Sequence, residues 1–190
     1  MKQLLFVLVA ITLFSCKEDS KVEEAVAKIP IEFKVERFDK IFYESKPEDL
    51  NKIKAQYPFF FPAGNPDSVW VNKLKNPLLK ELYKEVQIKY PTLGPIEADM
   101  EKMFAYVQYY FPKYKTPRVI TLISEVDTEA KSFYVDTLDL VSLDCYLGKD
   151  HRFYVDFPEY KKAELEENQI LPNLVSTFCY GKIAPPMDRT

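Results

Sequence analysis

The spacing of apolar residues changes along the chain and separates predicted helices from predicted strands. Ile31, Phe33 and Val35 alternate with charged residues, which predicts a half-buried strand at residues 31–36. Between residues 45 and 112 the apolar positions follow the helical repeat, and from residue 118 they form short β-branched runs. The pattern therefore places most of the helices before most of the strands.

The middle of the chain carries clear start and stop signals for helices. Ser45-Lys46-Pro47-Glu48 resembles a capping box and opens a short helix that ends near Tyr57, and Asn65-Pro66 and Asn76-Pro77 are further start signals. A proline after each of two longer apolar stripes ends two longer helices. The stripes, which we interpret as core and not as a cofactor site, are Leu79, Leu82, Tyr83, Val86 and Tyr90, then Ile96, Met100, Met103, Phe104, Val107 and Phe111.

The second half predicts a small sheet. Residues 119–123, 133–135 and 138–143 read as three short strands, and the links between them are short enough for antiparallel neighbours. Residues 159–170 are highly charged and predict an exposed helix or loop, and a further helix is expected after Asn173. The expected fold class is α+β, mainly helical, with a small antiparallel sheet of about three or four short strands.

The composition excludes several classes of function. The 190 residues hold 26 Lys and Arg against 29 Asp and Glu, and a formal charge of −3 gives no positive field for nucleic acid. Four glycines, with neither a GxGxxG nor a P-loop motif, argue against a nucleotide-binding enzyme. A single histidine cannot build a His/His zinc site from this chain alone. We therefore expect no cofactor and no nucleic-acid partner.

The first sixteen residues indicate a lipoprotein signal. Met1-Lys2-Gln3 is a positive start, and Leu4 to Phe14 is an uncharged apolar run, too short for the ~20 residues that span a bilayer. Leu13-Phe14-Ser15-Cys16 resembles the bacterial lipobox, in which the cysteine thiol receives diacylglycerol before cleavage. Residues 1–15 are then a signal peptide, and acyl chains such as palmitate attach Cys16 to membrane lipid. An ordinary signal peptide with a coincidental cysteine is the alternative.

Residues 16–30 have no sustained apolar face and are interpreted as a flexible tether before a single domain at residues 31–190. Lys17-Glu18-Asp19 resembles a surface-export signal of Bacteroidota lipoproteins, and it equally fits the charged start of any tether. A periplasmic and a surface-facing position in the cell envelope thus both fit. Because Pro185-Pro186-Met187-Asp188 is a helix-start pattern, we also expect the domain to be incomplete at its C-terminus.

Residues 139–151 hold the densest cluster of metal-capable side chains, Asp139, Asp144, Cys145, Asp150 and His151. Their spacing matches no known metal site. A turn with Gly148 at positive φ and an Asx-type bond from Asp150 explains the same residues. We interpret Asp144, Asp150 and His151 as a structural turn or polar cluster and expect no catalytic or metal-binding residue. Cys145 and Cys179 either pair or stay free thiols.

Aromatic residues recur beside prolines, at residues 57–62, 90–91, 109–112 and 157–160. Such groups close helix ends, and exposed rings also bind sugars or partner proteins. Phe59, Phe60 and Phe61 are the residues that we expect first in a partner surface.

Four stretches of the chain carry a family likeness: the lipobox at Cys16, Arg37-Phe38-Asp39 with Phe42, Tyr109-Tyr110-Phe111-Pro112, and residues 143–154. Together they resemble the gliding motility lipoprotein GldB family of Bacteroidota. The resemblance implies an envelope lipoprotein that gliding requires and that is functionally linked to type IX secretion. It also implies that members of the family are longer than this chain.

The same family is distantly similar to zinc peptidases in which a strand meander precedes an HExxH helix. The corresponding residues 171–182 contain no histidine, so metal-activated water lacks its ligands there. The leading hypothesis is a membrane-anchored, non-enzymatic accessory that binds or stabilises other gliding or secretion envelope proteins. A zinc metallopeptidase-like hydrolase, or a degenerate relative of one, and a glycan-binding lipoprotein are the alternatives.

Overall fold

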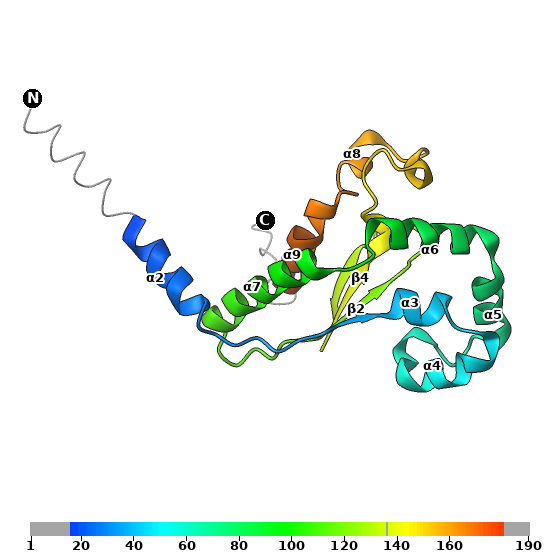
Figure 1. The fold of residues 1–190 in the computed structure, drawn as a ribbon, viewed down its shortest axis with the longest axis horizontal. Helices are drawn as coiled ribbons and strands as arrows, with labels where there is room; N and C mark the ends of the chain where they lie inside the picture. The colour runs from blue at the N-terminus through cyan, green and yellow to red at the C-terminus, as the bar shows by residue number, and fades with distance from the viewer. Residues whose placement is uncertain (1–15, 136, 181–190) are drawn as a thin grey trace, which may run out of the picture. The chain divides into compact units, whose positions relative to one another are not determined.

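The computed structural model describes residues 16–135 and 137–180 of the chain. Contacts within the chain divide it into two units, residues 1–32 with 95–116, and residues 33–94 with 117–190 (Figure 1). The expected signal peptide at residues 1–15 and the expected break at residues 185–190 lie outside the described residues. The expected domain boundaries stay predictions.

The first unit contains helices α2 (Cys16–Val26) and α7 (Gly94–Tyr110). The α7 helix confirms the apolar stripe predicted there, and it buries Met100 and Phe104. The segment that we expect to act as a tether is helical over α2, and Val26 at its end is buried. Its flexibility stays a prediction. Because residues 16–30 have no sustained apolar face, the sequence pattern gave no signal for this helix.

The second unit is built on a four-stranded sheet of β1 (Val35–Arg37), β2 (Arg118–Leu122), β3 (Ser132–Val135) and β4 (Leu138–Ser142), in the order β1-β2-β4-β3. The α+β class is confirmed, and so are the three strands predicted after residue 118. The sheet is mixed, however, because β1 pairs with β2 and β2 with β4 in parallel, and only β3 and β4 are antiparallel. The short link between β3 and β4 suits an antiparallel hairpin. The longer link between β2 and β3 takes the chain past the position of β4, so β4 lies between β2 and β3.

The first predicted strand is wrong in its extent. Alternation suggested residues 31–36, but the ladder with β2 pairs only Val35, Glu36 and Arg37 with Val119, Ile120 and Thr121. Residues 31–34 continue the alternating sequence, but the ladder with β2 does not include them.

Helices α3 (Phe38–Tyr43), α4 (Leu50–Gln56), α5 (Asp67–Lys75) and α6 (Pro77–Lys89) follow β1 (Figure 1). Three-residue 3-10 turns at Pro47–Asp49 and Pro58–Phe60 flank α4. One apolar cluster packs α3, α4 and α5 on Ile120 of β2, and its other members are Phe38, Phe42, Leu50, Ile53, Tyr57, Phe61 and Leu74. The α6 helix buries Leu79, Leu82 and Val86. The helices predicted after Ser45, Asn65 and Asn76 are thus confirmed as α4, α5 and α6, whereas α3 was not predicted.

Capping explains where two of these helices begin and end. The Asn76 side chain accepts hydrogen bonds from the backbone N–H groups of Leu78 and Leu79, which confirms the predicted start of α6. Ser45 has a different role from the predicted cap, since its hydroxyl donates to the Phe42 carbonyl at the end of α3.

After β4 the chain forms 3-10 turns at Leu143–Cys145, Arg152–Tyr154 and Glu167–Gln169, with α8 (Glu159–Lys162) and α9 (Ile170–Tyr180). The α9 helix packs on β3, where the rings of Tyr134 and Phe178 lie 5.4 Å apart between centroids. The last predicted helix is confirmed but starts before Asn173, because Pro172 is tolerated in the first helical turn.

Candidate functional site

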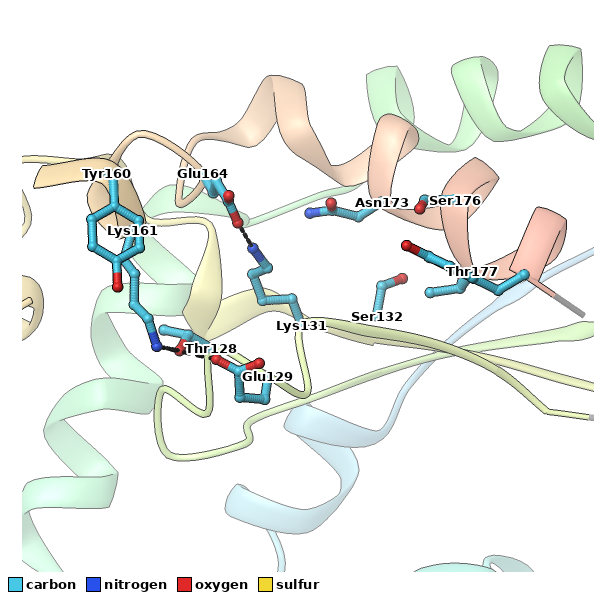
Figure 2. Close-up of a pocket in the computed structure, with 11 residues that line it drawn as sticks. Thr128, Glu129, Lys131, Ser132, Tyr160, Lys161, Glu164, Asn173, Ser176 and Thr177 are labelled. Carbon is cyan, nitrogen blue, oxygen red and sulfur yellow. Dashed lines mark hydrogen bonds and ion pairs between the residues drawn. The ribbon is translucent and has the colours of Figure 1, made fainter. Parts of the chain in front are cut away.

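A pocket of about 470 Å³ opens in the second unit between the loop before β3, α8 and α9 (Figure 2). Its volume lies within the range of small-molecule sites. Polar side chains from three separate segments of the chain line it, so the pocket exists only once β3 and α9 have packed together.

The loop before β3 supplies the floor of the pocket. Two hydrogen bonds from Ser142 of β4 fix this loop, because the Ser142 N–H donates to the Lys131 carbonyl and its hydroxyl to the Ala130 carbonyl. The Lys131 side chain is only 14% exposed, and its ammonium pairs with the Glu164 carboxylate. Ser132 is 8% exposed, and its hydroxyl has no hydrogen-bond partner among the described residues.

The wall from α8 carries a second ion pair. The Lys161 ammonium lies 3.1 Å from a Glu129 carboxylate oxygen and 3.4 Å from the Thr128 hydroxyl. The hydrogen bond to Glu129 raises the pKa of Lys161. Beside it the Tyr160 ring is 69% exposed, so it presents an open aromatic surface at the side of the pocket (Figure 2).

The α9 wall presents hydroxyl and amide groups. The Asn173 amide N–H donates to the hydroxyl of Tyr146, a fully buried residue, over 2.9 Å. This bond fixes the Asn173 side chain and leaves its amide oxygen without a hydrogen-bond partner among the described residues. Ser176, Thr177 and Tyr180 complete the wall, and Tyr180 is 83% exposed.

The charges of the pocket cancel within it. Lys131 faces Glu164 and Lys161 faces Glu129, so each positive group already has a carboxylate partner. The pocket thus offers hydroxyls, an amide oxygen and two tyrosines without a net charge. Such groups suit the binding of a neutral polar ligand better than acid–base chemistry, which needs a group poised to exchange a proton.

Asp144, from the predicted polar cluster, is a buried structural residue. Its carboxylate accepts hydrogen bonds from the backbone N–H groups of Ser124 at 2.9 Å and Val126 at 2.6 Å. Burial raises the pKa of Asp144 to about 6, against the effect of these hydrogen bonds. Glu125 and Val126 have positive φ angles of 66° and 61°, a strained conformation for a β-branched residue. Asp144 therefore holds the start of the loop that forms the pocket floor.

Asp150 and His151 lie apart from Asp144. Gly148 has a φ of 110°, which confirms the predicted turn. The predicted Asx bond is wrong, because the His151 ring accepts from the Phe153 N–H and Asp150 is exposed, with no side-chain hydrogen bond among the described residues. His151 also lies 3.4 Å from Glu85. In the part of the chain that the structure describes, no three His, Cys, Asp or Glu side chains converge on a metal position.

The predicted surface at Phe59–Phe61 is mostly core. Phe61 is 7% exposed, and Phe60 is half-buried with its ring 4.4 Å from that of Phe38. Phe59 alone of the three is exposed, at 41%. The run of three rings straddles a 3-10 turn, so successive side chains point in different directions and cannot form one surface.

Cys145 and Cys179 are both free thiols. Cys145 is buried, its Sγ lies 3.4 Å from the Asp127 carbonyl oxygen, and burial raises the pKa of its thiol. Cys179 on α9 is half-buried. The sequence left open whether Cys145 and Cys179 form a disulfide, and in the structure they do not.

Sequence reasoning found little of the pocket. Tyr160 belongs to one of the aromatic-proline groups, and it is the one pocket residue that those groups contain. Lys131, Ser132 and Asn173 carry no local motif, because the pocket forms from segments brought together by the β3–α9 packing. The available signal for the pocket was in α9, where Asn173, Ser176 and Thr177 lie away from the buried Leu174 and Phe178.

The fold is of the α+β class and carries a polar pocket, and comparison with known families identifies the family of the chain. A family model described as gliding motility protein GldB matches residues 19–190. The chain belongs to this family of gliding motility lipoproteins. No curated protein and no solved structure was found to match it. Among the described residues, no helix has the length and apolar character needed to cross a bilayer.

Proposed function

We propose that this protein is a lipid-anchored, non-enzymatic accessory of the gliding machinery that binds or stabilises partner proteins linked to type IX secretion. The observation that carries the proposal is membership of the gliding motility family over residues 19–190. The lipobox pattern ending at Cys16 supplies the anchor, and acyl chains contribute about 0.8 kcal/mol per buried CH₂.

The state of the polar side chains supports a binding role over catalysis. The carboxylate of Asp144 is occupied by two backbone N–H groups, and His151 is occupied by a capping bond and by Glu85. A catalytic carboxylate or imidazole instead needs access to substrate. Asp144 and His151, two of the side chains that the sequence offered for chemistry, therefore hold the fold in place.

The experiment replaces the gene with a Cys16→Ala variant and measures colony spreading, membrane association and the abundance of gliding and secretion proteins. We expect loss of membrane association and spreading, with lower levels of at least one partner. Cys179→Ala is the matched control, since it removes a half-buried thiol far along the sequence from the anchor. Normal spreading and normal partner levels with the unlipidated variant overturn the proposal.

Metal analysis separates the accessory from a metallopeptidase-like hydrolase. The full-length protein, purified from the membrane without chelators, is expected to contain zinc well below one equivalent. Stoichiometric zinc that survives dialysis favours the hydrolase.

A further inference from the structure

The polar pocket has a group that the fold itself leaves without a partner. The Ser132 hydroxyl is buried and unpartnered among the described residues, and Figure 2 shows it pointing toward α9 near Thr177. An unsatisfied buried hydroxyl costs about 1–3 kcal/mol. Such a group persists in a fold when something else, a ligand or water, completes its hydrogen bonding.

We infer that this pocket binds a carbohydrate, a neutral saccharide of one or two rings. The inference goes beyond the proposed function and does not depend on it, because it concerns a ligand of the isolated protein. Sugars present many hydroxyls that both donate and accept hydrogen bonds. The Ser132 hydroxyl can donate to or accept from a sugar hydroxyl, and the Asn173 amide oxygen can accept from one.

The charge balance selects against anions. A phosphate or carboxylate ligand needs free cations, but the Lys131 ammonium is paired with Glu164 and the Lys161 ammonium with Glu129. A neutral ligand can instead use both members of each pair, accepting from an ammonium and donating to a carboxylate. No ion pair has to break for it to bind.

The aromatic residues at the pocket fit the apolar face of a sugar ring. Tyr160 and Tyr180 are 69% and 83% exposed, and exposed tyrosines combine a large apolar surface with a polar tip. The sequence suggested sugar binding at Phe59–Phe61, but the exposed rings that adjoin hydroxyl and amide groups are these two. The volume of about 470 Å³ accommodates a ligand of this size.

The site is also built on supported elements. Ser132 begins β3, and Asn173 is held by its bond to the buried Tyr146. A binding group whose position is fixed before the ligand arrives loses less conformational entropy on binding.

The test uses full-length protein in a detergent without a sugar headgroup and measures saturation-transfer NMR and calorimetric titration. The probes are cellobiose, maltose, lactose, N,N′-diacetylchitobiose and the neutral oligosaccharides released from the envelope of the source bacterium. We expect saturation of ring C–H protons in at least one probe. Tyr160→Ala is expected to weaken its affinity about 3- to 10-fold.

A second variant distinguishes a ligand contact from a structural one. Ser132→Ala removes a buried hydroxyl that has no partner in the described structure, so it is expected to leave the thermal midpoint unchanged or raised while weakening sugar binding about 3- to 10-fold. Tyr110→Ala is the matched control, because Tyr110 is 62% exposed and belongs to the other unit. It is expected to bind the sugar as the unmodified protein does.

Three results overturn the inference. They are no saturation transfer to any neutral probe, binding that neither variant changes, and displacement of the sugar by inorganic phosphate at equal concentration.

Discussion

The Arg37 guanidinium donates to the Asp39 carboxylate over 2.7 Å, and the Asp39 side chain is fully buried. Thr121 of β2 donates to the same carboxylate at 2.5 Å, and Gln87 of α6 donates at 3.0 Å. Arg37 in turn donates to the Tyr90 carbonyl at the end of α6. The two charged residues therefore join β1, α3, β2 and α6 through one network.

The first prediction concerns this network. Asp39→Ala leaves Arg37, which is 16% exposed, without its carboxylate and leaves Thr121 without its acceptor. Removing one member of a buried ion pair costs about 3–5 kcal/mol. Urea unfolding monitored by circular dichroism is expected to show a loss of this size.

Lys54→Ala serves as the control, because it removes an exposed ion pair with Asp67 that is worth at most about 1 kcal/mol. Equal losses for Asp39→Ala and Lys54→Ala would show that the network contributes no more than a surface pair.

The sequence predicted α4, α5, α6 and α7 because their signals are local, and it missed α2 and α3. The Asn76 cap and the prolines after each stripe act within a few residues, so no distant contact is needed to place them. The position of β1 and the order of the strands depend on pairing with residues about 80 positions away, which periodicity cannot reveal. The role of Arg37 and Asp39 was not predicted for the same reason, because their hydrogen-bond partners are distant in the sequence. Their motif indicated the family but not the hydrogen-bond network.

The candidate site was less predictable than the fold. Asp144 and His151 were candidates because their side chains can bind metals. In the structure the Asp144 carboxylate supports the loop at Ser124, and the His151 ring caps a turn. Two pocket groups without a hydrogen-bond partner in the described structure are the Ser132 hydroxyl and the Asn173 amide oxygen, and ordinary polar residues such as these carry no sequence signature. Only the packing of α9 on β3 makes them neighbours.

The second prediction separates core from surface within Phe59–Phe61. Phe61→Ala removes a buried ring that contacts Trp70, with centroids 4.8 Å apart, and is expected to cost about 3–5 kcal/mol. Phe59→Ala removes an exposed ring and is expected to cost less than about 1 kcal/mol. Thermal and urea unfolding of both variants measure the difference. If Phe59→Ala is the more harmful substitution, the placement of the core at Phe61 is wrong.

The third prediction concerns the turn at Gly148. Its φ of 110° is a conformation that L side chains rarely adopt, while the nearest atom to an added Cβ, Glu166 Oε2, is 3.9 Å away. Gly148→Ala therefore costs backbone strain without a steric clash, about 1–3 kcal/mol. Gly64→Ala is the matched control, since an added Cβ meets nothing within 4 Å, and it is expected to change stability by less than about 1 kcal/mol. A neutral Gly148→Ala in equilibrium unfolding contradicts the strained turn.

The fourth prediction follows from Asp139, a buried residue of β4 whose Oδ1 has no hydrogen-bond partner in the described structure. Burial raises the pKa of Asp139 to about 7. Between about pH 4 and pH 7 the unfolded chain releases a proton that the folded protein keeps, so stability falls as pH rises through this window. Asp144, with its pKa raised to about 6, acts in the same direction over the lower part of the range.

Asp139→Asn cannot ionise, so its share of the pH dependence disappears. We expect the free energy of unfolding to fall less between pH 4.5 and pH 8 in the variant than in the unmodified protein. The two decreases are expected to differ by on the order of 2–4 kcal/mol. Urea unfolding at pH 4.5, 6 and 8 measures it. Asp150→Asn, at an exposed residue on the Gly148 turn, is the control for a general effect of replacing Asp by Asn. Parallel profiles for Asp139→Asn and the unmodified protein would mean that Asp139 is already ionised in the folded state, which contradicts the prediction.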